Sequence, residues 1–596
     1  MHNNFVYGIH SNRMLIFQFS LVNQGVIMNS SSIFDPTLAV SAMEEWQKFW
    51  FKPNEKVASQ SSSSASQLFD SWQQQMHDAT AFWQNAWAEV MPKQTTENGE
   101  EQAQSWSNLP WFANIKNAYD SSCEFIRKQL EANAVSLSDD RKESLRFMTE
   151  QYLAAMNPDN FLATNPEALQ EAFETKGQSL VKGVQNYLHD FEQGKITMSD
   201  GTPFIIGENT AATPGKVVLR TELYELIQYA PATEKVFEKP LLIIPPCVNK
   251  YYLMDLAPQK SLVEYLVSQG LRVFLVSWKS ATPEMKHFTW DTYVERGVIN
   301  AIDTVRAITK KDSINALGFC IGGVLLTTAL AVLKARGNNY VDNVLFMTSM
   351  VDHSDPGDIK HFITEEFMRN RLAQMEKGGI VSGLELQATF SFLRPQDLVW
   401  NYVRDNYLKG KTPRPFDMLS WNSDSVDLPM PMHTYFLQKC YVENALIKKG
   451  GMTVCGVPVD IATIDIPMYF YASETDHIVL AHSVYDGIKF FTGCPEKRFV
   501  LGESGHIAGA INPVSRNRRS YWTGENLPET FDEWRETSEN HKGSWWVDAV
   551  KWFGERSGKE IKASQTFGNS TYAPVCDAPG EYVRAKALPA LKTHFV

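Results

Sequence analysis

The residues of this chain that can perform covalent chemistry are a cysteine, an aspartate and a histidine, in that order along the sequence. Cys320 lies within Gly-Phe-Cys-Ile-Gly, directly after the apolar run INALGF (314–319). Asp476 follows the apolar run IPMYFYA, and His506 follows the run KRFVLG. A thiolate is a strong nucleophile, an imidazole accepts its proton, and a carboxylate orients the imidazole and stabilises its charged form. The three side chains therefore indicate acyl transfer through a covalent thioester.

The sequence around Cys320 matches the nucleophile elbow of the α/β-hydrolase fold, G-x-S-x-G, with cysteine in place of serine. This fold places the nucleophile at a sharp turn between a strand and a helix, where the side chain meets the substrate. A thioester is a better acyl donor than an oxoester, so cysteine indicates transfer of the acyl group rather than its hydrolysis. We expect Gly318, Gly322 and Gly323 to be steric necessities of the tight turn and of close helix packing.

Asp476, His506 and the expected oxyanion donors also occupy positions along the chain that the α/β-hydrolase fold requires. Nucleophile, acid and histidine follow the chain order of α/β-hydrolases, and each comes at the C-terminal end of a predicted strand, where ligands gather in open sheets. An oxyanion needs two backbone donors, and Ile321 N–H is the first. The second should come from the loop after the run PLLIIPP. Because that run ends in two prolines without N–H groups, Cys247 or Val248 is the first available donor, and we predict Val248.

Two alternatives compete with these assignments. His477 adjoins Asp476, but adjacent side chains on extended backbone point in different directions, and the fold needs a histidine after the final strand. His506 is therefore preferred. Free cysteine is also often an inert buried residue, which the elbow sequence around Cys320 makes the less favoured interpretation.

From about residue 201 the sequence alternates apolar runs with helical patterns, which is typical of an α/β domain with a parallel sheet. Helical patterns cover about 259–269 and 291–311. The rhythm is interrupted at about 351–440, a stretch rich in Phe, Leu, Met and Trp, which we interpret as a cap inserted over the site. The predicted strands are 240–246, 271–278, 314–320, 341–350, 466–476 and 497–506.

A chain of 596 residues exceeds what one hydrophobic core usually supports, so we expect two domains. Residues 28–200 are predicted to form a mainly helical N-terminal domain, and residues 201–596 the catalytic α/β-hydrolase domain. Residues 1–27 contain an apolar stretch too short to span a bilayer, and no A-x-A cleavage site follows it. We expect 1–27 to be a non-native or disordered extension, with the natural start at Met28.

Tryptophan pairs at helical spacing mark the N-terminal domain: Trp46 with Trp50, and Trp83 with Trp87. Each pair would lie on one face of a helix. Such a face usually packs against the rest of the protein, and this is the preferred interpretation. The alternative is an amphipathic surface that touches a hydrophobic polymer or a partner.

Composition excludes several classes of function. A net charge of −12 without a long Lys/Arg run argues against nucleic acid as the main partner. The seven cysteines form no CxxC, which fits free thiols in a reducing cytoplasm rather than disulfides or a zinc site. There is no GxGxxG, P-loop or HExxH, so we expect no nucleotide cofactor and no metal.

Longer motifs carry a resemblance to a known family. They are NPDNFLATNPE (157–167), TPGKVVLRTELYELIQY (213–229), PPCVNKYYLMDL (245–256), GFCIGG (318–323), LSWNSD (419–424), ETDHIV (474–479), ESGHIAG (503–509) and HKGSWW (541–546). With these motifs the chain resembles the poly(3-hydroxyalkanoate) synthases, cysteine enzymes that polymerise 3-hydroxyacyl-CoA. The resemblance runs from about residue 150 to 583, and the length is similar to the class I type. Up to about residue 140 the match is one of character only.

The resemblance implies a reaction and a setting. The enzyme would add (R)-3-hydroxyacyl units, short ones such as 3-hydroxybutyryl by default, from coenzyme A to a growing polyester. Its catalytic residues would be Cys320, Asp476 and His506, and Asp476 has a second family role as activator of the 3-hydroxyl group. The family also implies a homodimer, a cap that moves to admit substrate, and association with polyester granules in the cytoplasm. Trp421 is a candidate for a cap or dimer contact.

Two other functions stay open. A thioesterase or polyester depolymerase of the same fold would use the same three side chains. A granule-coating scaffold with a dead site is a different class, but a scaffold has no need of Cys, Asp and His at three strand ends.

Overall fold

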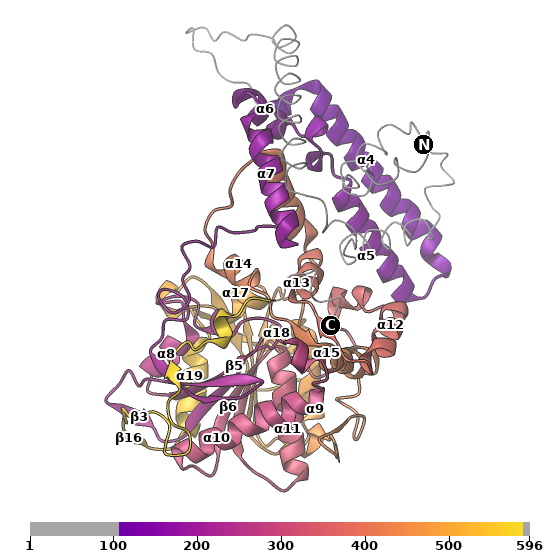
Figure 1. Ribbon diagram of the computed structural model, residues 1–596. Coiled ribbons are helices and arrows are strands. Elements are labelled where there is room, and N and C mark those ends of the chain that lie inside the picture. The colour runs from indigo at the N-terminus through magenta and orange to yellow at the C-terminus, as the bar shows by residue number, and fades with distance from the viewer. Residues whose placement is uncertain (1–105, 588–596) are drawn as a thin grey trace. The chain divides into compact units, whose positions relative to one another are not determined.

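The computed structural model describes residues 106–587, which form two compact units (Figure 1). The first unit consists of residues 106–196 together with Arg394–Pro413, and the second of Thr197–Leu393 together with residues 414–587. The predicted extension 1–27 and the tryptophan pairs at 46/50 and 83/87 lie outside the described residues.

The first unit is helical. Asparagine side chains cap two of its short helices, which explains why these helices begin where they do. Asn157 Oδ1 accepts from Asp159 N–H at 2.9 Å, and Asn165 Oδ1 accepts from Ala168 N–H at 2.9 Å. Its α-helices are α4 (Pro110–Asn133), α5 (Asp139–Ala155), α6 (Pro166–Glu174) and α7 (Gln178–Gln193). Its short 3-10 helices are η1 (Trp106–Asn108), η2 (Ala134–Ser136), η3 (Pro158–Asn160) and η4 (Leu162–Thr164), and its π-helical turns are η9 (Gln396–Trp400) and η10 (Val403–Leu408).

Residues far apart in sequence are joined inside this unit. Asn160 is buried and donates to the carbonyl oxygen of Ala154 at 2.8 Å, while its own carbonyl oxygen accepts from Arg404 Nε at 2.9 Å. The motif NPDNFLATNPE therefore has a structural role, since its asparagines cap helices and attach residues 394–413.

The second unit is built on an eleven-stranded sheet, counted over the described residues. In spatial order the strands are β15 (Glu539–Lys542), β14 (Ser520–Thr523), β13 (Lys497–Gly502), β12 (Met468–Ser473), β7 (Val341–Met347), β6 (Ile314–Phe319), β4 (Pro240–Ile244), β5 (Arg272–Trp278), β2 (Tyr224–Tyr229), β1 (Gly215–Arg220) and β17 (Cys576–Asp577). The six strands from β13 to β5 are parallel to one another, and each coincides with a predicted run, so this part of the prediction is confirmed. The antiparallel strands at both edges were not predicted.

Helices cover both faces of the sheet, because alternate strand residues point to opposite sides. In β4, Leu242 and Ile244 belong to one buried cluster, and Leu241 and Ile243 to the other. The first cluster includes α10 (Asn300–Thr309) and α11 (Ile321–Ala335), and the second includes α8 (Leu262–Ser268) and α19 (Trp546–Arg556). Figure 1 shows these two helix pairs on different sides of the strands. The result is a three-layer α/β-hydrolase architecture, as the sequence predicts.

Between β7 and β12 the chain leaves the sheet for a long insertion, where the sequence indicates a cap. The insertion contains residues 394–413, which belong to the first unit. Its other elements are η8 (Gly357–Phe362), α12 (Glu365–Met375), β8 (Ile380–Val381), α13 (Gly383–Phe392), α14 (Asp417–Asn422), β9 (Leu428–Pro429), α15 (Met430–Phe436), η11 (Leu437–Val442), β10 (Thr453–Val454), β11 (Val457–Pro458) and η12 (Ile461–Thr463).

The remaining elements of the second unit connect or flank the sheet. They are β3 (Lys235–Phe237), η5 (Tyr251–Met254), η6 (Pro283–Met285), α9 (Trp290–Thr292), the π-helix η7 (Tyr293–Ile299), α16 (Ala481–Gly487), η13 (Ile488–Phe490), α17 (His506–Ala510), η14 (Val514–Arg516), α18 (Phe531–Thr537), β16 (Glu560–Lys562) and η15 (Tyr582–Arg584).

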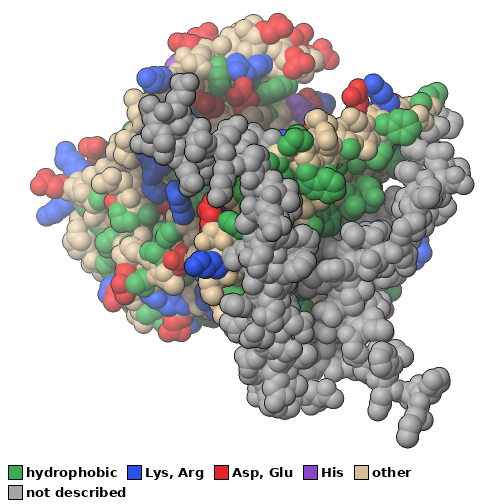
Figure 2. Space-filling view, turned by 90° about the horizontal axis from the view of Figure 1, so that it is seen from above, with side chains coloured by type: hydrophobic (Ala, Val, Ile, Leu, Met, Phe, Trp, Pro, Cys, Tyr) green, Lys and Arg blue, Asp and Glu red, His purple; other side chains and the backbone are tan. Residues whose placement is uncertain are grey.

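The surface of the described residues is charged and mixed. Figure 2 shows acidic and basic side chains interspersed on the face that it presents. Many of them pair, as Arg336 does with Glu295 at 2.7 Å. Among residues 106–587, no helix combines the length and apolar character needed to cross a membrane.

Candidate active site

Cys320 occupies a strained turn between β6 and α11. Its backbone has φ 52° and ψ −128°, a conformation that residues other than glycine rarely adopt. The turn is held by hydrogen bonds from Cys320 N–H to the Met347 carbonyl oxygen at 3.0 Å, and from Gly323 N–H to the Cys320 carbonyl oxygen at 2.8 Å. Strain of this kind persists only where the surroundings enforce it, and it concentrates at functional sites. The thiol is partly exposed, unlike the fully buried thiols of Cys247 and Cys440.

The glycines around Cys320 allow the strand and the helix to approach closely, as the sequence predicts. A Cβ atom on Gly318 would lie 2.5 Å from the Cα atom of Gly323. A Cβ atom on Gly322 would overlap the carbonyl oxygen of Ile244 and lie 2.6 Å from that of Pro245. The first turn of α11 therefore rests directly on the end of β4, and larger side chains would displace the elbow.

Asp476 and His506 form a buried pair. His506 Nδ1 lies 2.6 Å from Asp476 Oδ2, and the Asp476 side chain is completely inaccessible to solvent. The other carboxylate oxygen, Oδ1, accepts from the N–H groups of Ile478 and Val479, each at 2.9 Å. These bonds fix the carboxylate, which in turn fixes one ring nitrogen of His506 and directs the other away from it. The structure thus brings His506 to Asp476, in the arrangement preferred over His477.

The charge state of His506 follows from its neighbours. Burial lowers the pKa of His506, but the charges of Asp476 and Cys320 and hydrogen bonds to both side chains raise it to about 10. The Cys320 side chain is thus one of the two neighbours that favour the charged form of the ring. At neutral pH the ring therefore holds a proton.

The helix that carries His506 is anchored by the motif HKGSWW. Trp545 Nε1 donates to the Gly509 carbonyl oxygen at 3.1 Å, and Trp546 Nε1 donates to that of Ala510 at 3.0 Å. These are the last residues of α17, where carbonyl groups lack partners within the helix. The Trp545 ring also stacks on Tyr471 of β12, with ring centroids 3.9 Å apart. This short helix is therefore bound to the strand that precedes Asp476.

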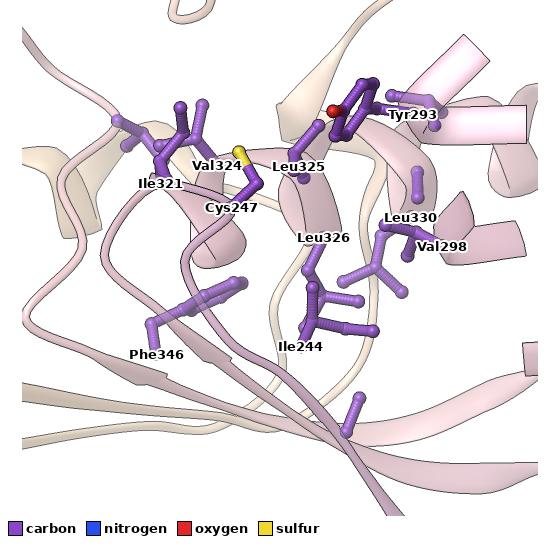
Figure 3. Packing of buried hydrophobic residues seen from close by; sticks show 14 of the residues in the cluster. Ile244, Cys247, Tyr293, Val298, Ile321, Val324, Leu325, Leu326, Leu330 and Phe346 are labelled. Carbon is purple, nitrogen blue, oxygen red and sulfur yellow. The ribbon is translucent and has the colours of Figure 1, made fainter. Parts of the chain in front are cut away.

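The predicted oxyanion donors belong to the segments that follow two neighbouring strands, Ile321 after β6 and Val248 after β4. Ile321 N–H is the first of α11, one of the donors that a helix leaves without an internal partner. Cys247, next to Val248, is fully buried and lies beside Ile321 and Val324 (Figure 3). Burial raises the pKa of Cys247 and the charge of Cys320 raises it further, which places the loop close to the nucleophile. Neither Ile321 N–H nor Val248 N–H donates in the backbone hydrogen bonds of the described residues. Their role as an oxyanion hole stays a prediction.

Tyr441, on η11, is a neighbour of the site that the sequence analysis missed. Burial raises its pKa, and the charges of Cys320, Cys440 and Asp476 add to that effect, so the hydroxyl lies near the reactive pair. Its ring packs edge-on against His353 and Phe436, with centroids 4.7 Å and 5.4 Å away. Burial lowers the pKa of His353 to about 4, which keeps this ring neutral. No local pattern around Tyr441 distinguishes it from other aromatic residues of the insertion.

Comparison with known proteins assigns the chain to a family. The model of the poly-beta-hydroxybutyrate polymerase (PhaC) N-terminus matches residues 100–266, and that of the α/β-hydrolase fold matches residues 240–513. The poly(3-hydroxyalkanoate) polymerase subunit PhaC of Cupriavidus necator is 44% identical over 529 residues, which cover 87% of this chain and 89% of that protein. The chain belongs to the poly(3-hydroxyalkanoate) polymerase family. The resemblance drawn from its motifs is confirmed.

Further polymerases align over similar lengths. The PhaC subunit of Rhizobium meliloti is 36% identical and covers 81% of this chain and 79% of its own length. Poly(3-hydroxyalkanoate) polymerase 1 of Ectopseudomonas oleovorans is 33% identical, with 81% and 85% covered. Because these relatives are polymerases, the present member of the poly(3-hydroxyalkanoate) polymerase family is an enzyme of polyester synthesis.

Proposed function

We propose that this enzyme polymerises (R)-3-hydroxyacyl-CoA, with 3-hydroxybutyryl-CoA as the representative substrate, and carries the acyl chain as a thioester on Cys320. The observation that supports this most strongly is the strained, partly exposed thiol of Cys320 beside the buried pair of His506 and Asp476. Family membership supports the polyester product. The reaction needs no cofactor besides the coenzyme A that the substrate brings.

In the first half-reaction, the Cys320 sulfur attacks the carbonyl carbon of the acyl-CoA. The carbonyl oxygen becomes an oxyanion, which the N–H groups of Ile321 and Val248 would stabilise. When the bond from carbon to the coenzyme A sulfur breaks, His506 gives its proton to the departing thiolate. One thioester is exchanged for another, so this step is close to balanced in free energy.

In the second half-reaction, a hydroxyl group attacks the Cys320 thioester. His506, now neutral, removes the proton of the hydroxyl, the new oxoester bond forms, and the bond from carbon to the Cys320 sulfur breaks. The ring is again an imidazolium beside a thiolate. Conversion of a thioester into an oxoester drives chain growth. Activation of the hydroxyl by Asp476 itself is the second family role, but the short bond from Asp476 to His506 Nδ1 favours orientation of the ring.

Water competes with the hydroxyl group, so the site has to be dry while the thioester exists. We propose that the insertion between β7 and β12 is the cap that excludes water and moves to admit substrate. Tyr441 and its aromatic neighbours supply an apolar wall near Cys320.

We further propose a homodimer that works at polyester granules in the cytoplasm. Support comes from exposed apolar side chains of the first unit, among them Trp111, Phe125 and Phe191, which suit an apolar partner.

The product identifies the function. Incubated with 3-hydroxybutyryl-CoA, the enzyme is expected to release coenzyme A and form turbid polymer, whereas a thioesterase would release coenzyme A and soluble acid. Cys320→Ala should fold normally and make no polymer, and Cys320→Ser should retain at most a trace, because it forms an oxoester. Turbidity and coenzyme A release are measured together.

Cys494→Ala is the matched control, because its thiol is partly buried and donates only to the nearby Glu496 carbonyl oxygen at 3.1 Å. It should keep full activity. Soluble acid as the main product would replace the polymerase proposal by the hydrolase alternative. Polymer from Cys320→Ala would exclude Cys320 as the nucleophile.

A further inference from the structure

The loop after β4, residues 245–250, carries the predicted oxyanion donor Val248, and we call it the oxyanion loop. It is fixed at both of its ends. At the start, the Pro245 carbonyl oxygen accepts from Trp278 Nε1 at 2.9 Å. At the end, the Lys250 carbonyl oxygen accepts from Trp421 Nε1 at 2.7 Å. Trp421 is therefore a buried contact of the insertion with this loop, one of the two roles expected for it. In between, Asn249 forms a β-bridge with Ser425.

The side chain of Lys250 is unusual for a lysine. It is only 3% exposed, and burial lowers its pKa. Its ammonium group donates to the carbonyl oxygens of Tyr582 and Ala585, at 3.3 Å and 2.5 Å. The charges of Asp424 and Asp427 favour its protonated form, while Lys586 opposes it. A buried ammonium group is costly without partners, so the two carbonyl groups are needed where they are.

Both carbonyl groups belong to residues 576–585, which we call the C-terminal strap. Its first residues pair with β1 as β17. Beyond them, the completely buried carboxylate of Glu225 accepts from the N–H groups of Glu581 and Tyr582, each at 3.0 Å. A Cβ atom on Gly580 would overlap this same carboxylate. The strap is thus bound to β2 by the buried carboxylate of Glu225, and it binds in turn the buried ammonium group of Lys250.

We propose that the C-terminal strap positions the oxyanion loop, with Lys250 as the positioning residue through which it acts. This rests on the proposed function, since it assigns the strap to the acylation of Cys320. The chain of contacts runs from Glu225 to the strap, from the strap to the Lys250 ammonium group, and from the Lys250 backbone to Val248 two residues earlier. Donors of an oxyanion hole act only where the oxyanion forms, so small shifts of the loop cost rate.

Two reactions of the same sulfur separate this role from a general structural one. Acylation by an acyl-CoA passes through an oxyanion and needs the loop in place. Alkylation by iodoacetamide forms a carbon–sulfur bond with loss of iodide and passes through no oxyanion. A displaced loop therefore slows acylation and leaves alkylation of Cys320 unchanged, whereas a disturbed site slows both.

Lys250→Met keeps the length of the side chain and removes its charge. With 3-hydroxybutyryl-CoA, we expect kcat for coenzyme A release to fall by a factor of about 10 to 100, less than the roughly 100- to 1000-fold effect of losing one oxyanion donor outright. KM and the alkylation rate of Cys320 should stay within about twofold of the unsubstituted enzyme. Gly580→Ala tests the strap itself and is expected to give the same pattern more weakly, because it displaces the strap from Glu225.

Lys586→Met is the matched control, since it removes the same charge next to the strap, at a side chain that is 80% exposed. It should leave both rates unchanged. Unchanged acylation in Lys250→Met and Gly580→Ala would overturn the proposal, and so would a parallel loss of acylation and alkylation, or of folding, in both variants. Failure of the proposed function is a separate result, because it would appear as soluble acid in place of polymer from the unsubstituted enzyme, or as polymer from the Cys320→Ala variant.

Discussion

At the scale of single residues, the site is a sulfur whose environment is set by two buried side chains. Asp476 contributes a carboxylate whose two oxygens are both occupied, one by His506 and the other by the N–H groups of Ile478 and Val479. One ring nitrogen of His506 is consequently fixed by Asp476, and the other is left for proton transfer. This geometry accounts for the residue types in the sequence: no neutral side chain in place of Asp476 would hold the ring charged.

The raised pKa of His506 predicts how stability depends on pH. The folded protein keeps the His506 proton up to about pH 10, and an unfolded histidine loses it near ~6.5. The stabilisation is therefore complete below about pH 6.5 and is lost as the pH rises towards 10. Asp476→Asn removes the largest effect that raises this pKa. Its apparent Tm should lie below that of the unsubstituted enzyme by a few degrees at pH 6.5, and the difference should shrink by pH 10.

Asp355→Asn is the control for this measurement. Asp355 contacts His482 at 2.9 Å, but both side chains are nearly half exposed, so water screens their interaction. Thermal unfolding of both variants at several pH values tests the sign. A Tm difference for Asp476→Asn that grows between pH 6.5 and pH 10 would contradict the assignment of the charge on His506.

At the scale of elements, the elbow depends on close contact between α11 and the end of β4. β4 and β6 are neighbouring parallel strands with Ile244 beside Gly318, so the turn at Cys320 and the oxyanion loop start from the same edge of the sheet. Gly322 is the residue at which α11 touches β4. The predicted donors follow these two strands directly along the chain, Ile321 after β6 and Val248 after β4.

Gly322→Ala should therefore impair the enzyme far more than the addition of one methyl group suggests. The added methyl group has no space, and overpacking of this kind costs about 1–3 kcal/mol or moves the backbone. We expect kcat for coenzyme A release to fall at least tenfold.

Gly337→Ala, at the other end of α11, is the matched control. A Cβ atom there meets nothing within 4 Å, although φ is +75°. It should lower stability by about 1–2 kcal/mol, because of the left-handed backbone, and keep kcat. Thermal unfolding and steady-state kinetics measure both effects. Equal kcat values for the two variants would show that close packing at Gly322 has no part in the site.

The elements show how much of this fold is readable from sequence. The six parallel strands were predictable because both faces of each are buried, which makes them continuous apolar runs. The edge strands β14 and β15 were not predictable, since both are short and mixed in polarity, and β14 is only partly buried while β15 is mostly exposed. The first unit's share of the insertion, residues 394–413, was also hidden, because its attachment to Asn160 is a contact between distant parts of the chain.

The residues of the site also divide into those that the sequence could predict and those that it could not. Cys320, Asp476 and His506 could be found because each directly follows a predicted strand and the fold prescribes their order. Tyr441 and Lys250 could not, since their importance comes only from what surrounds them. Trp421 carried a recognisable motif, but its partner, the carbonyl oxygen of Lys250, is a backbone atom that sequence does not mark.

At the scale of the whole molecule, distant segments meet around one edge of the sheet. In the second unit these segments are the elbow, the pair of Asp476 and His506, the C-terminal strap and the insertion apart from residues 394–413. The first unit presents exposed apolar side chains on its helices, a surface suited to a hydrophobic partner. A polymerase has to keep a reactive thioester dry while a water-insoluble product grows. We propose that the second unit keeps the thioester dry and that the first unit contacts the growing product.

The central claim is that Cys320 carries the growing chain, and capture of the acyl-enzyme tests it most directly. The enzyme is mixed with 3-hydroxybutyryl-CoA, quenched in acid within one turnover, digested and analysed by mass spectrometry. We predict that the peptide containing Cys320 gains one or more 3-hydroxybutyryl units, and that neutral hydroxylamine removes them, as it does with a thioester. Polymer formation with an unmodified Cys320, or with the acyl units on another residue, would contradict the account.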